Sequence, residues 1–597
     1  MSNMHVSRIV VKNFRSLKHL DVPIQPGSSA IIGENSVGKS NLFHALRICL
    51  DGQLSSSYRS LLKDDIHCQV NLAAAFQVLI GVEFSGFQGN ENQEALLHGT
   101  EIEENRARLF YRFRPKRIVR EELAREEFRR PLTLEDYSWE LAGGGNPAMD
   151  LADIEWADEL PELGATSVNL QYLQSYLVVF LPALRDVEAD LQSRRSTLTR
   201  LIEAFQIGVD EQNELIRAVQ TANAEIEGSP TIQGIAESID RAFKDITGPA
   251  FSLDVELGLS SPSFQSILRN LIVLLSNGLV SKFEPRRNGL GLNNILYIAT
   301  LIEYFRKRAE VGRAAGELLL IEEPEAHLHP QLQSTLLGAF SSLPFQSLVS
   351  THSTQVTAKV PLSNYVVMTI QADGTPFAVA PASNPRLSPA EIQDLSRYLD
   401  ATKSNLLFAR KVMLVEGAAE MLLIPPLVKR VLGIDLEREG ISLVAIHGAH
   451  FAAFAHLFAE DCLPKRCAIV GDADHDVAPV PPDEDVPAPP NLEQLRGPYV
   501  QVFLGATTFE KELVTEENLD MLIAVAAELG APRLREALER HDLLGLDPVP
   551  VELKNKVLRT AKRFGKGRFA QVAARHVELA GTVPSYIVNA INWLREQ

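Results

Sequence analysis

The residues with the clearest chemical signature form a glycine-containing loop near the start of the chain, GENSVGKS, at residues 33–40. Residues 29–32, with the sequence SAII, read as a strand that precedes this loop, and a helical pattern follows it, which is the strand–loop–helix context of a phosphate-binding motif. Backbone amides at the start of the helix would face the phosphates, Lys39 would add a point charge, and Ser40 would bind Mg²⁺. We therefore predict that the chain binds ATP. The residues of this prediction are Gly33, Asn35, Gly38, Lys39, Ser40 and Asn41.

Two apolar runs much further along the chain end in residues that could act on the γ-phosphate of that ATP. Residues 317–321 lead into Glu322 and Glu323, and residues 346–350 lead towards His352. Side chains at the carboxyl ends of parallel strands lie at the same edge of a sheet, beside the phosphates. We expect Glu322 to hold the Mg²⁺-bound water, Glu323 to orient the attacking water, and His352 to lie near the γ-phosphate. The alternative, a generic strand with exposed glutamates, does not explain three motifs in this order.

These three motifs resemble those of ABC-type ATPase heads, which chromosome-maintenance and recombination-factor proteins share. The resemblance implies a signature segment before the second motif, and Asn288, Gly289 and Gly291 match it in degenerate form. They open an amphipathic helix that we expect over residues 295–307. In the family, this segment covers the ATP of the opposite head. The resemblance therefore implies a homodimer, or two copies within a larger assembly.

A second set of acidic residues follows two other apolar runs. Residues 411–415 read as a strand that ends in Glu416, and Glu420 lies on the first turn of the helix that follows. Residues 466–471 read as another strand, followed by Asp472 and Asp474, which face the same side of an extended segment. Four carboxylates at the ends of adjacent strands repel one another unless a cation neutralises them. The pattern therefore implies Mg²⁺ or Mn²⁺.

This second arrangement resembles the Toprim fold. No part of the chain is left to form the separate DNA-gate domain of a topoisomerase, and the cysteines do not supply the zinc module of a primase, so a two-metal nuclease remains. The whole chain resembles the OLD family (overcoming lysogenisation defect), ABC ATPase–Toprim fusions that include nucleases paired with a helicase in Gabija-type defence systems. The resemblance implies that Glu510 binds metal and that Lys566 is catalytic and neutralises charge on the scissile phosphate. Gly471 departs from the family pattern, which often has serine or threonine there.

The order of these motifs gives an α/β fold class with an ABC-type head, a helical insert and a C-terminal Toprim domain. We expect the head in residues 1–186 and 263–400, the insert in residues 187–262 and the Toprim domain in residues 405–597. The insert is too short for a DNA-spanning arm. We expect it to be compact and to mediate dimerisation, with packing on its own head as the alternative. A further strand is expected at residues 271–275.

The bulk composition limits the partners of the protein. A net charge of −18 argues against a protein that coats nucleic acid over its whole surface. Four arginines in residues 106–114 predict a solvated basic face on a strand, whereas residues 554–568 hold seven cations that could contact DNA or be simply solvated. The four cysteines lack metal-ligand spacing, which indicates reduced thiols. Without a signal peptide or a long apolar run, we expect a cytoplasmic protein with no membrane span.

Taken together, these features predict a metal-dependent DNA endonuclease that is regulated by ATP and serves anti-phage defence. The expected cofactors are ATP and Mg²⁺, or Mn²⁺ at the nuclease site. The expected partners are DNA, further copies of the chain in a dimer or tetramer, and a helicase or another defence-system protein. Two alternatives stay open: an ATP-dependent DNA repair clamp with an inactive Toprim domain, and an effector nuclease that attacks tRNA or another RNA.

Overall fold

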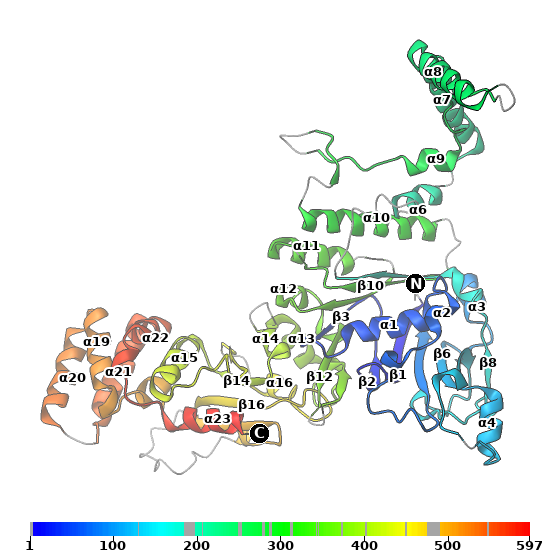
Figure 1. The fold of residues 1–597 in the computed structure, drawn as a ribbon. Coiled ribbons are helices and arrows are strands. Elements are labelled where there is room, and N and C mark those ends of the chain that lie inside the picture. Colours follow the sequence, from blue (N-terminus) through cyan, green and yellow to red (C-terminus); the bar gives the residue numbers. More distant parts are fainter. Residues whose placement is uncertain are drawn as a thin grey trace. The chain divides into compact units, whose positions relative to one another are not determined.

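The chain folds into two compact units, which are considered separately below. Unit 1 comprises Met1–Phe180, Leu318–Glu325 and Pro330–Gln597, and unit 2 comprises Leu181–Glu317 and Ala326–His329. Figure 1 shows the elements in the computed structural model. It describes residues 4–128, 130–183, 197–205, 207–248, 253–276, 281–285, 289–310, 315–326, 328–341, 343, 345–371, 374–399, 403–447, 451–473, 490–545 and 548–596.

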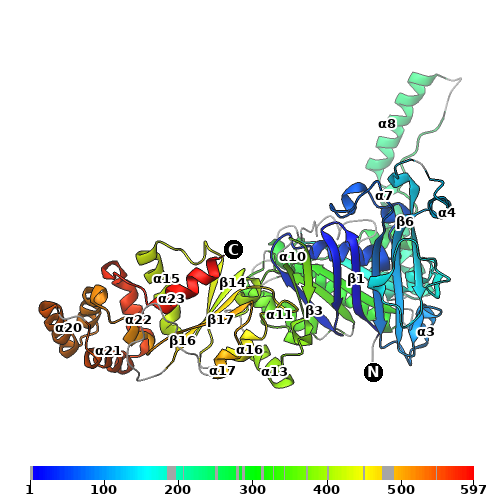
Figure 2. The same cartoon turned by 90° about the horizontal axis from the view of Figure 1, so that it is seen from below.

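An antiparallel sheet forms one layer of the ATPase part of unit 1. Its strand order is β2-β1-β4-β6-β7-β8, and β5 pairs with β6. Figure 2 shows the sheet with β1 and β6 labelled. Alternate side chains of a strand point to opposite faces, so one face packs on α1 and the other on the residues around Leu151. The strands are β1 (His5–Phe14), β2 (Leu17–Pro23), β4 (Val78–Ser85), β5 (Glu101–Glu103), β6 (Arg106–Pro115), β7 (Tyr137–Gly144) and β8 (Ala165–Ser167).

A second sheet of the ATPase part carries the phosphate-binding loop. Its order is β13-β12-β3-β11-β10-β9, and β12, β3, β11 and β10 are mutually parallel neighbours. The expected strands before the loop, before Glu323 and before His352 are therefore confirmed. The strands are β3 (Ser28–Gly33), β9 (Tyr176–Leu181), β10 (Gly316–Glu322), β11 (Gln346–Thr351), β12 (Tyr365–Ile370) and β13 (Pro376–Val379).

Helices and hydrophobic cores join these sheets. Ile31 of β3 packs in the core that α1 shares with the antiparallel sheet, while Ala30 and Ile32 face a second core. That second core continues into the Toprim domain, where it includes Val412 and Ile469. The helices of the ATPase part are α1 (Lys39–Leu50), α2 (Ser56–Arg59), α3 (Glu91–Leu97), α4 (Arg117–Ala124), α11 (Pro330–Ser341), α12 (Thr354–Thr357), α13 (Pro389–Tyr398) and α14 (Asn405–Phe408).

The Toprim domain is built on a parallel sheet of order β15-β14-β16-β17. Its strands are almost entirely apolar because helices and loops cover both faces. Its strands are β14 (Lys411–Val415), β15 (Ile441–Ala445), β16 (Cys467–Asp472) and β17 (Val500–Gly505). Its helices are α15 (Ala418–Leu432), α16 (Phe451–Ala455), α17 (Pro490–Glu493), α18 (Phe509–Glu512), α19 (Leu519–Glu528), α20 (Pro532–Leu544), α21 (Val551–Phe564), α22 (Lys566–Arg575) and α23 (Ser585–Arg595).

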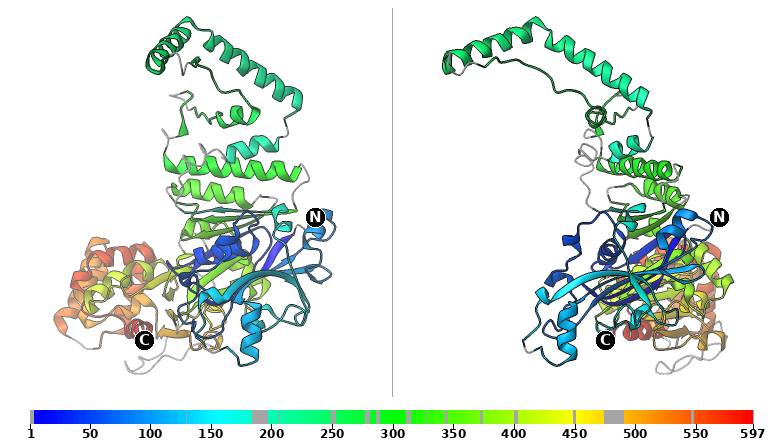
Figure 3. Two further views of the ribbon diagram at one scale, coloured as in Figure 1. Left: turned by 45° about the vertical axis from the view of Figure 1, so that its right-hand side comes forward. Right: turned by 90° about the vertical axis from the view of Figure 1, so that its right-hand side faces the viewer.

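Unit 2 is helical over most of its described length. It contains α6 (Thr197–Ala204), α7 (Val209–Glu227), α8 (Pro230–Thr247), α9 (Phe264–Arg269) and α10 (Leu290–Glu310). Neither α7 nor α8 buries a single side chain, so this part of the insert is not the compact module we expected. Figure 3 shows these two blue-green helices standing clear of α6 and α10 within the unit.

Two expectations about local structure were wrong. Residues 271–275 do not form a strand: Leu275 makes one bridge to Phe283, and Leu271 and Ile272 are about half exposed. The arginines of β6 do not form a solvated face either. Arg108, Arg112 and Arg114 are fully buried, and Glu83 and Glu140 pair with them across the sheet. A buried charge needs such partners, and the sequence pattern does not reveal carboxylates on neighbouring strands.

Two simpler expectations hold. All four cysteines are free thiols, in agreement with the prediction of reduced cysteines. Among the described helices, none has both the length and the apolar character needed to cross a bilayer.

Candidate functional sites

The phosphate-binding loop lies between β3 and α1, as the motif requires. Gly38 adopts a left-handed conformation at the start of α1, with φ 104°, and an added Cβ would lie 2.8 Å from Leu17 and Ser16. A Cβ on Gly33 would lie 2.3 Å from the backbone oxygen of Met368 on β12. Only glycine fits at these two positions. The loop is therefore held close to the sheet, with Asn35 and Ser40 exposed on it.

Lys39 sits beneath the loop, among the carboxylates of the second motif. Its Nζ donates hydrogen bonds to the backbone oxygens of Gly33, at 3.0 Å, and Glu34, at 2.8 Å. Burial lowers the pKa of Lys39 to about 8, while the charges of Glu323, Glu325 and Glu322 oppose that shift. The lysine and the carboxylates, which lie far apart in sequence, thus meet at one edge of the sheet.

The residues after β10 and β11 are tied to each other. The amide of Glu323 donates to Ser350 O at 2.9 Å, and His352 Nε2 lies 3.6 Å from Glu323 Oε1. Burial and the charge of Lys39 lower the pKa of His352, while Glu323 opposes them. An imidazole of lowered pKa is neutral at neutral pH, so it can accept or donate a hydrogen bond beside a phosphate.

Glu325 is a residue of this site that the motif analysis did not assign. Its Oε1 accepts hydrogen bonds from Thr351 Oγ1, at 2.7 Å, and from the amide of His352, at 2.9 Å. Glu325 therefore fixes the chain next to His352. The sequence could have indicated Glu325, because it is the third carboxylate of the segment EEPE at residues 322–325.

Other predicted ATP-site residues occupy different positions. Asn41 donates a hydrogen bond to Ser16 Oγ at 2.8 Å and accepts one from Arg15 at 3.4 Å. In unit 2, Gly289 precedes α10 and Gly291 lies in its first turn, because the helix begins at Leu290 rather than at residue 295. Asn288 lies outside the described residues.

The second candidate site lies at the carboxyl edge of the Toprim sheet. Glu416 follows β14, Glu420 is on the first turn of α15, Asp472 ends β16 and Glu510 is on α18. Two of the four carboxylates accept backbone hydrogen bonds: Glu420 Oε2 accepts from the Gly417 amide at 3.1 Å, and Glu416 Oε1 accepts from the Asp472 amide at 2.8 Å. The side chains that the sequence predicted to act together are thus gathered here. Asp474 lies outside the described residues.

Gly471 allows the approach of Glu416 to the neighbouring strand. A Cβ at residue 471 would lie 3.0 Å from Glu416 Oε1. The departure from the family pattern at this position therefore has a physical counterpart, since a side chain here would crowd the first carboxylate of the site.

Burial and the charges of neighbouring carboxylates raise pKa values within this cluster. Burial raises the pKa of Asp472 to about 8, and the charges of Glu416 and Glu420 add to the shift. Burial raises the pKa of Glu420 as well, helped by Glu416 and Glu510. Such shifts arise where several carboxylates share a site without enough positive charge.

Lys566 is the cation that the chain itself contributes. Its Nζ lies 3.1 Å from Glu510 Oε2, and Glu510 is almost fully buried. Burial lowers the pKa of Lys566, but Glu510, Asp472 and Glu420 more than offset this and raise it. Lys566 is therefore charged and reaches the carboxylate cluster.

The donor set fits a divalent metal ion. All members are hard oxygen ligands. Oε2 of Glu510 pairs with Lys566, while its Oε1 is buried without a hydrogen-bond donor among the described residues. Across the part of the chain that the structure describes, no three His, Cys, Asp or Glu side chains already converge as a preformed metal group. The described carboxylates lie at the same edge of the sheet, but they do not surround a common point at metal-binding distance. Asp474 lies outside the described residues.

Tyr586 was not predicted to belong to this region. It is nearly fully buried on α23, and its ring lies against Gly505, where a Cβ would be 3.1 Å away. Burial raises the pKa of its hydroxyl well above the ordinary value, and the charge of Asp472 adds to the shift. Tyr586 thus stays protonated beside the carboxylates.

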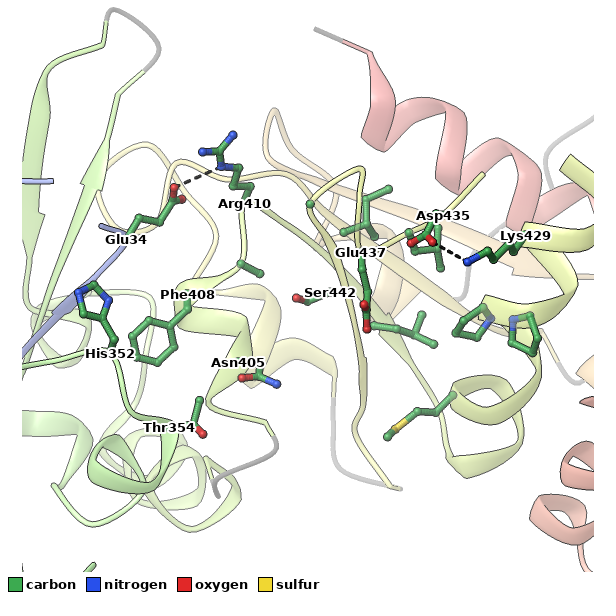
Figure 4. A pocket seen from close by; sticks show the side chains of 18 of the residues that line it. Glu34, His352, Thr354, Asn405, Phe408, Arg410, Lys429, Asp435, Glu437 and Ser442 are labelled. Atoms are coloured by element: carbon green, nitrogen blue, oxygen red, sulfur yellow. Dashed lines mark hydrogen bonds and ion pairs between the residues drawn. The ribbon is translucent and has the colours of Figure 1, made fainter. Parts of the chain in front are cut away.

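An ion pair joins the phosphate-binding loop to the Toprim domain within unit 1. Arg410 Nε lies 3.2 Å from Glu34 Oε2. Figure 4 shows this pair beside His352, at one side of a hollow of about 1030 Å³ that Lys429 and Asp435 border at the other side. Arg410 directly precedes β14, whose end carries Glu416. The two candidate sites are thus connected by one short strand.

Two family models match the chain. Residues 28–358 match the model described as "AAA domain, putative AbiEii toxin, Type IV TA system". Residues 407–474 match the model described as "Overcoming lysogenization defect protein-like, TOPRIM domain". The first match covers more than half of the chain.

The chain is also similar to individual proteins. The chain is 23% identical to the Old nuclease of Escherichia phage P2 over 74% of this chain and 73% of that protein. It is 21% identical to Endonuclease GajA of Bacillus cereus over 75% of this chain and 72% of that protein. The C-terminal region of the Burkholderia pseudomallei OLD protein is a similar solved structure, with 26% identity, 32% of this chain and 98% of that chain covered, and a TM-score of 0.25.

Proposed function

We propose that this chain, which belongs to the AAA domain family and to the OLD family of ATPase–Toprim proteins, is a metal-dependent endonuclease that cleaves or nicks duplex DNA under the control of ATP. The observation that carries the proposal is the gathering of Glu416, Glu420, Asp472 and Glu510 beside Lys566. Hydrolysis of a phosphodiester needs positive charge near the phosphate, because negative charge develops there. The carboxylates would hold metal cations, and Lys566 supplies a cation of its own.

The chain's own residues have distinct roles in this proposal. Glu416, Glu420, Asp472, Asp474 and Glu510 would hold the metal ions. When bound, these ions activate water and stabilise the leaving oxygen. Lys566 holds the scissile phosphate and offsets its charge. The hydrogen bond from the Asp472 amide to the Glu416 carboxylate ties the ends of β14 and β16 together, so that the carboxylates keep their relative positions.

The ATP site has a regulatory role in this proposal. Gly33, Gly38 and Lys39 bind the phosphates, Ser40 and Glu322 hold Mg²⁺, and Glu323 and His352 act on the γ-phosphate. Cleavage at the Toprim carboxylates consumes no ATP, so the nucleotide serves to select a state of the protein. The hydrophobic core that extends from β3 to β14 and β16 supports a mechanical link between the two sites.

The Glu34–Arg410 ion pair is one contact through which the ATP site could act on the Toprim carboxylates, and it can be tested. Nucleotide binding reorganises the loop that carries Glu34, and Arg410 lies at the start of the strand that ends at Glu416. The Arg410 side chain is 76% exposed, and an exposed pair contributes about 1 kcal/mol or less. We therefore expect Arg410→Ala to reduce the effect of ATP on cleavage by about two- to fivefold, measured as the ratio of cleavage rates with and without ATP.

The control for this variant is Arg397→Ala, which removes an exposed arginine paired with Asp394 on α13. Cleavage without ATP is expected to be unchanged in both variants. An ATP effect in Arg410→Ala equal to that of the wild type would show that the ion pair does not transmit the nucleotide state.

The activity itself is tested with purified protein and supercoiled plasmid, with Mg²⁺, Mn²⁺ or EDTA. The proposal expects nicked or linear product that needs a divalent metal. Tight ATP-dependent DNA binding without cleavage would instead favour the repair-clamp alternative. Cleavage of tRNA or another RNA in the same assay, with intact plasmid, would favour the effector alternative.

We also propose that the insert brings two copies of the chain together. On α8, Ile235 and Ile239 are almost half exposed, and with Phe243 they line an apolar hollow. Full burial of such a side chain contributes about 1.5–3 kcal/mol, and each of these two is already about half buried, so covering it contributes about half of that in each copy. Ile235→Asp with Ile239→Asp should therefore weaken self-association at least 100-fold in sedimentation velocity. Asn213→Asp with Gln220→Asp adds the same charge to α7. An unchanged dimer in the isoleucine variant would remove α8 from the interface.

A role in anti-phage defence completes the proposal and rests on the resemblance to the OLD family. Cells that express the protein are expected to support fewer phage plaques than cells that express Glu416→Ala. A helicase or another defence-system partner would be recovered with the tagged protein from its native host. Equal plaque counts would limit the proposal to nuclease activity.

A further inference from the structure

The helix that leads to Lys566 has one apolar face and one cationic face. On α21, Leu553, Val557 and Ala561 are buried at intervals of four residues and pack in the Toprim core. Away from that apolar face lie four cations: Lys556, and then Arg559, Lys562 and Arg563, where Arg559 is three or four residues from each of the other three. We call these four residues the basic face of α21. The three last of them are exposed.

The basic face has no neutralising carboxylates in the described part of the chain. The structure shows no ion pair for any of its four residues, and Arg559 Nε bonds only to the backbone oxygen of Asn555. The helix has one acidic residue, Glu552, on its first turn. Like charges at these spacings repel one another by a few tenths of a kcal/mol per pair. In a chain with a net charge of −18, this concentration of positive charge indicates an anionic partner.

The basic face ends where the candidate nuclease site begins. Gly565, with φ 92°, turns the chain from α21 into α22, whose first residue is Lys566. Helix α21 packs on α18, which carries Glu510, and α22 packs on α15, which carries Glu420. A Cβ on Gly567 would lie 3.7 Å from the Cβ of Ala418, at the start of α15. The cations and the carboxylates therefore belong to elements in direct contact.

We propose that the basic face of α21 binds the phosphate backbone of double-stranded DNA and guides a phosphodiester to Lys566. The basic face runs from Lys556 to Arg563, about 11 Å along the helix axis, which matches about three phosphates along one strand of a duplex. The only aromatic residue of α21, Phe564, packs against the core, so the face offers no platform for unstacked bases. The choice of DNA as the partner rests on the proposed function.

The test measures binding apart from cleavage. Fluorescence anisotropy with a labelled 30-base-pair DNA duplex, in EDTA and over a series of salt concentrations, compares the wild type with Arg559→Gln/Lys562→Gln/Arg563→Gln. Loss of three phosphate contacts should weaken binding by about 100-fold and reduce the slope of log affinity against log salt by about 3. The control, Lys18→Gln/Lys63→Gln/Lys359→Gln, removes the same charge from exposed positions of the ATPase part.

Each outcome separates this proposal from the proposed nuclease. An unchanged affinity and salt slope in the α21 variant, or an equal loss in the control, overturns the proposal even if the wild type cleaves DNA. Tighter binding of an RNA duplex of the same length overturns the choice of DNA. Conversely, a wild type that binds through α21 but cleaves nothing with Mg²⁺ or Mn²⁺ supports the basic face and refutes the nuclease. Thermal unfolding confirms that the variants are folded, since their substituted side chains point away from the core.

Discussion

Replacement of Lys566 by alanine should reduce metal-dependent cleavage of plasmid DNA by about 100- to 1000-fold, the loss typical when one group that stabilises transition-state charge is removed. Among the described residues, Lys566 is the only cation within ion-pair distance of Glu510, a carboxylate of the cluster. Without it, a phosphate that approaches the carboxylates meets only negative side chains and the metal ions that they hold. Initial rates of plasmid nicking at saturating Mg²⁺ provide the measurement.

The control for Lys566→Ala is Lys429→Ala on α15, which removes an equal charge from a lysine paired with Asp435. Lys429→Ala should cut DNA at the rate of the wild type, and Lys566→Arg, which keeps the charge, should recover part of the lost rate. ATP hydrolysis should be the same in all three. Cleavage at the wild-type rate by Lys566→Ala would exclude Lys566 from the chemistry and would move the nuclease site elsewhere.

Replacement of Lys39 by alanine should have the second large effect, a loss of activity at the ATP site. ATP hydrolysis should fall by about 100- to 1000-fold, because the charge that Lys39 places beside the β- and γ-phosphates is lost. Cleavage without ATP should persist, because the Toprim carboxylates and Lys566 are unchanged. Phosphate release and plasmid nicking, measured on one preparation, report on the two sites.

The control for Lys39→Ala is Lys18→Ala, at an exposed position of the ATPase part. Removal of Lys39 also exposes the backbone oxygens of Gly33 and Glu34, which its Nζ holds. Thermal unfolding must therefore show that the variant is folded. Hydrolysis at the wild-type rate in folded Lys39→Ala would contradict the assignment of this loop to ATP.

Much of this architecture follows from local sequence. Apolar runs that end in Gly33, Glu322, Glu416 and Asp472 are buried strands, and buried strands of a parallel sheet bring their carboxyl ends to one edge. The loop glycines are explained in the same way, because Gly33 and Gly38 lie where a side chain would clash. Spacing and periodicity located the strand ends of both candidate sites, whereas Glu510 and Lys566 came only from the family resemblance.

The contacts that pattern could not predict depend on residues far apart in the chain. The basic pattern of β6 gave no sign of Glu83 or Glu140, whose positions across the sheet turn exposed charges into buried ion pairs. Similarly, an arginine before β14 has no sequence link to Glu34, 376 residues earlier. The apolar residues 271–275 have strand-like composition, but among the described residues their only pairing is one bridge, from Leu275 to Phe283.

The central claim is that nuclease chemistry takes place at the Toprim carboxylates and that the ATP site only regulates it. One side-by-side measurement tests this most directly: plasmid nicking without ATP by wild type, Lys39→Ala and Lys566→Ala at saturating Mg²⁺. The account predicts that Lys39→Ala cuts at the basal rate of the wild type while Lys566→Ala shows almost no cleavage. Loss of all cleavage in folded Lys39→Ala, with cleavage retained in Lys566→Ala, would contradict it.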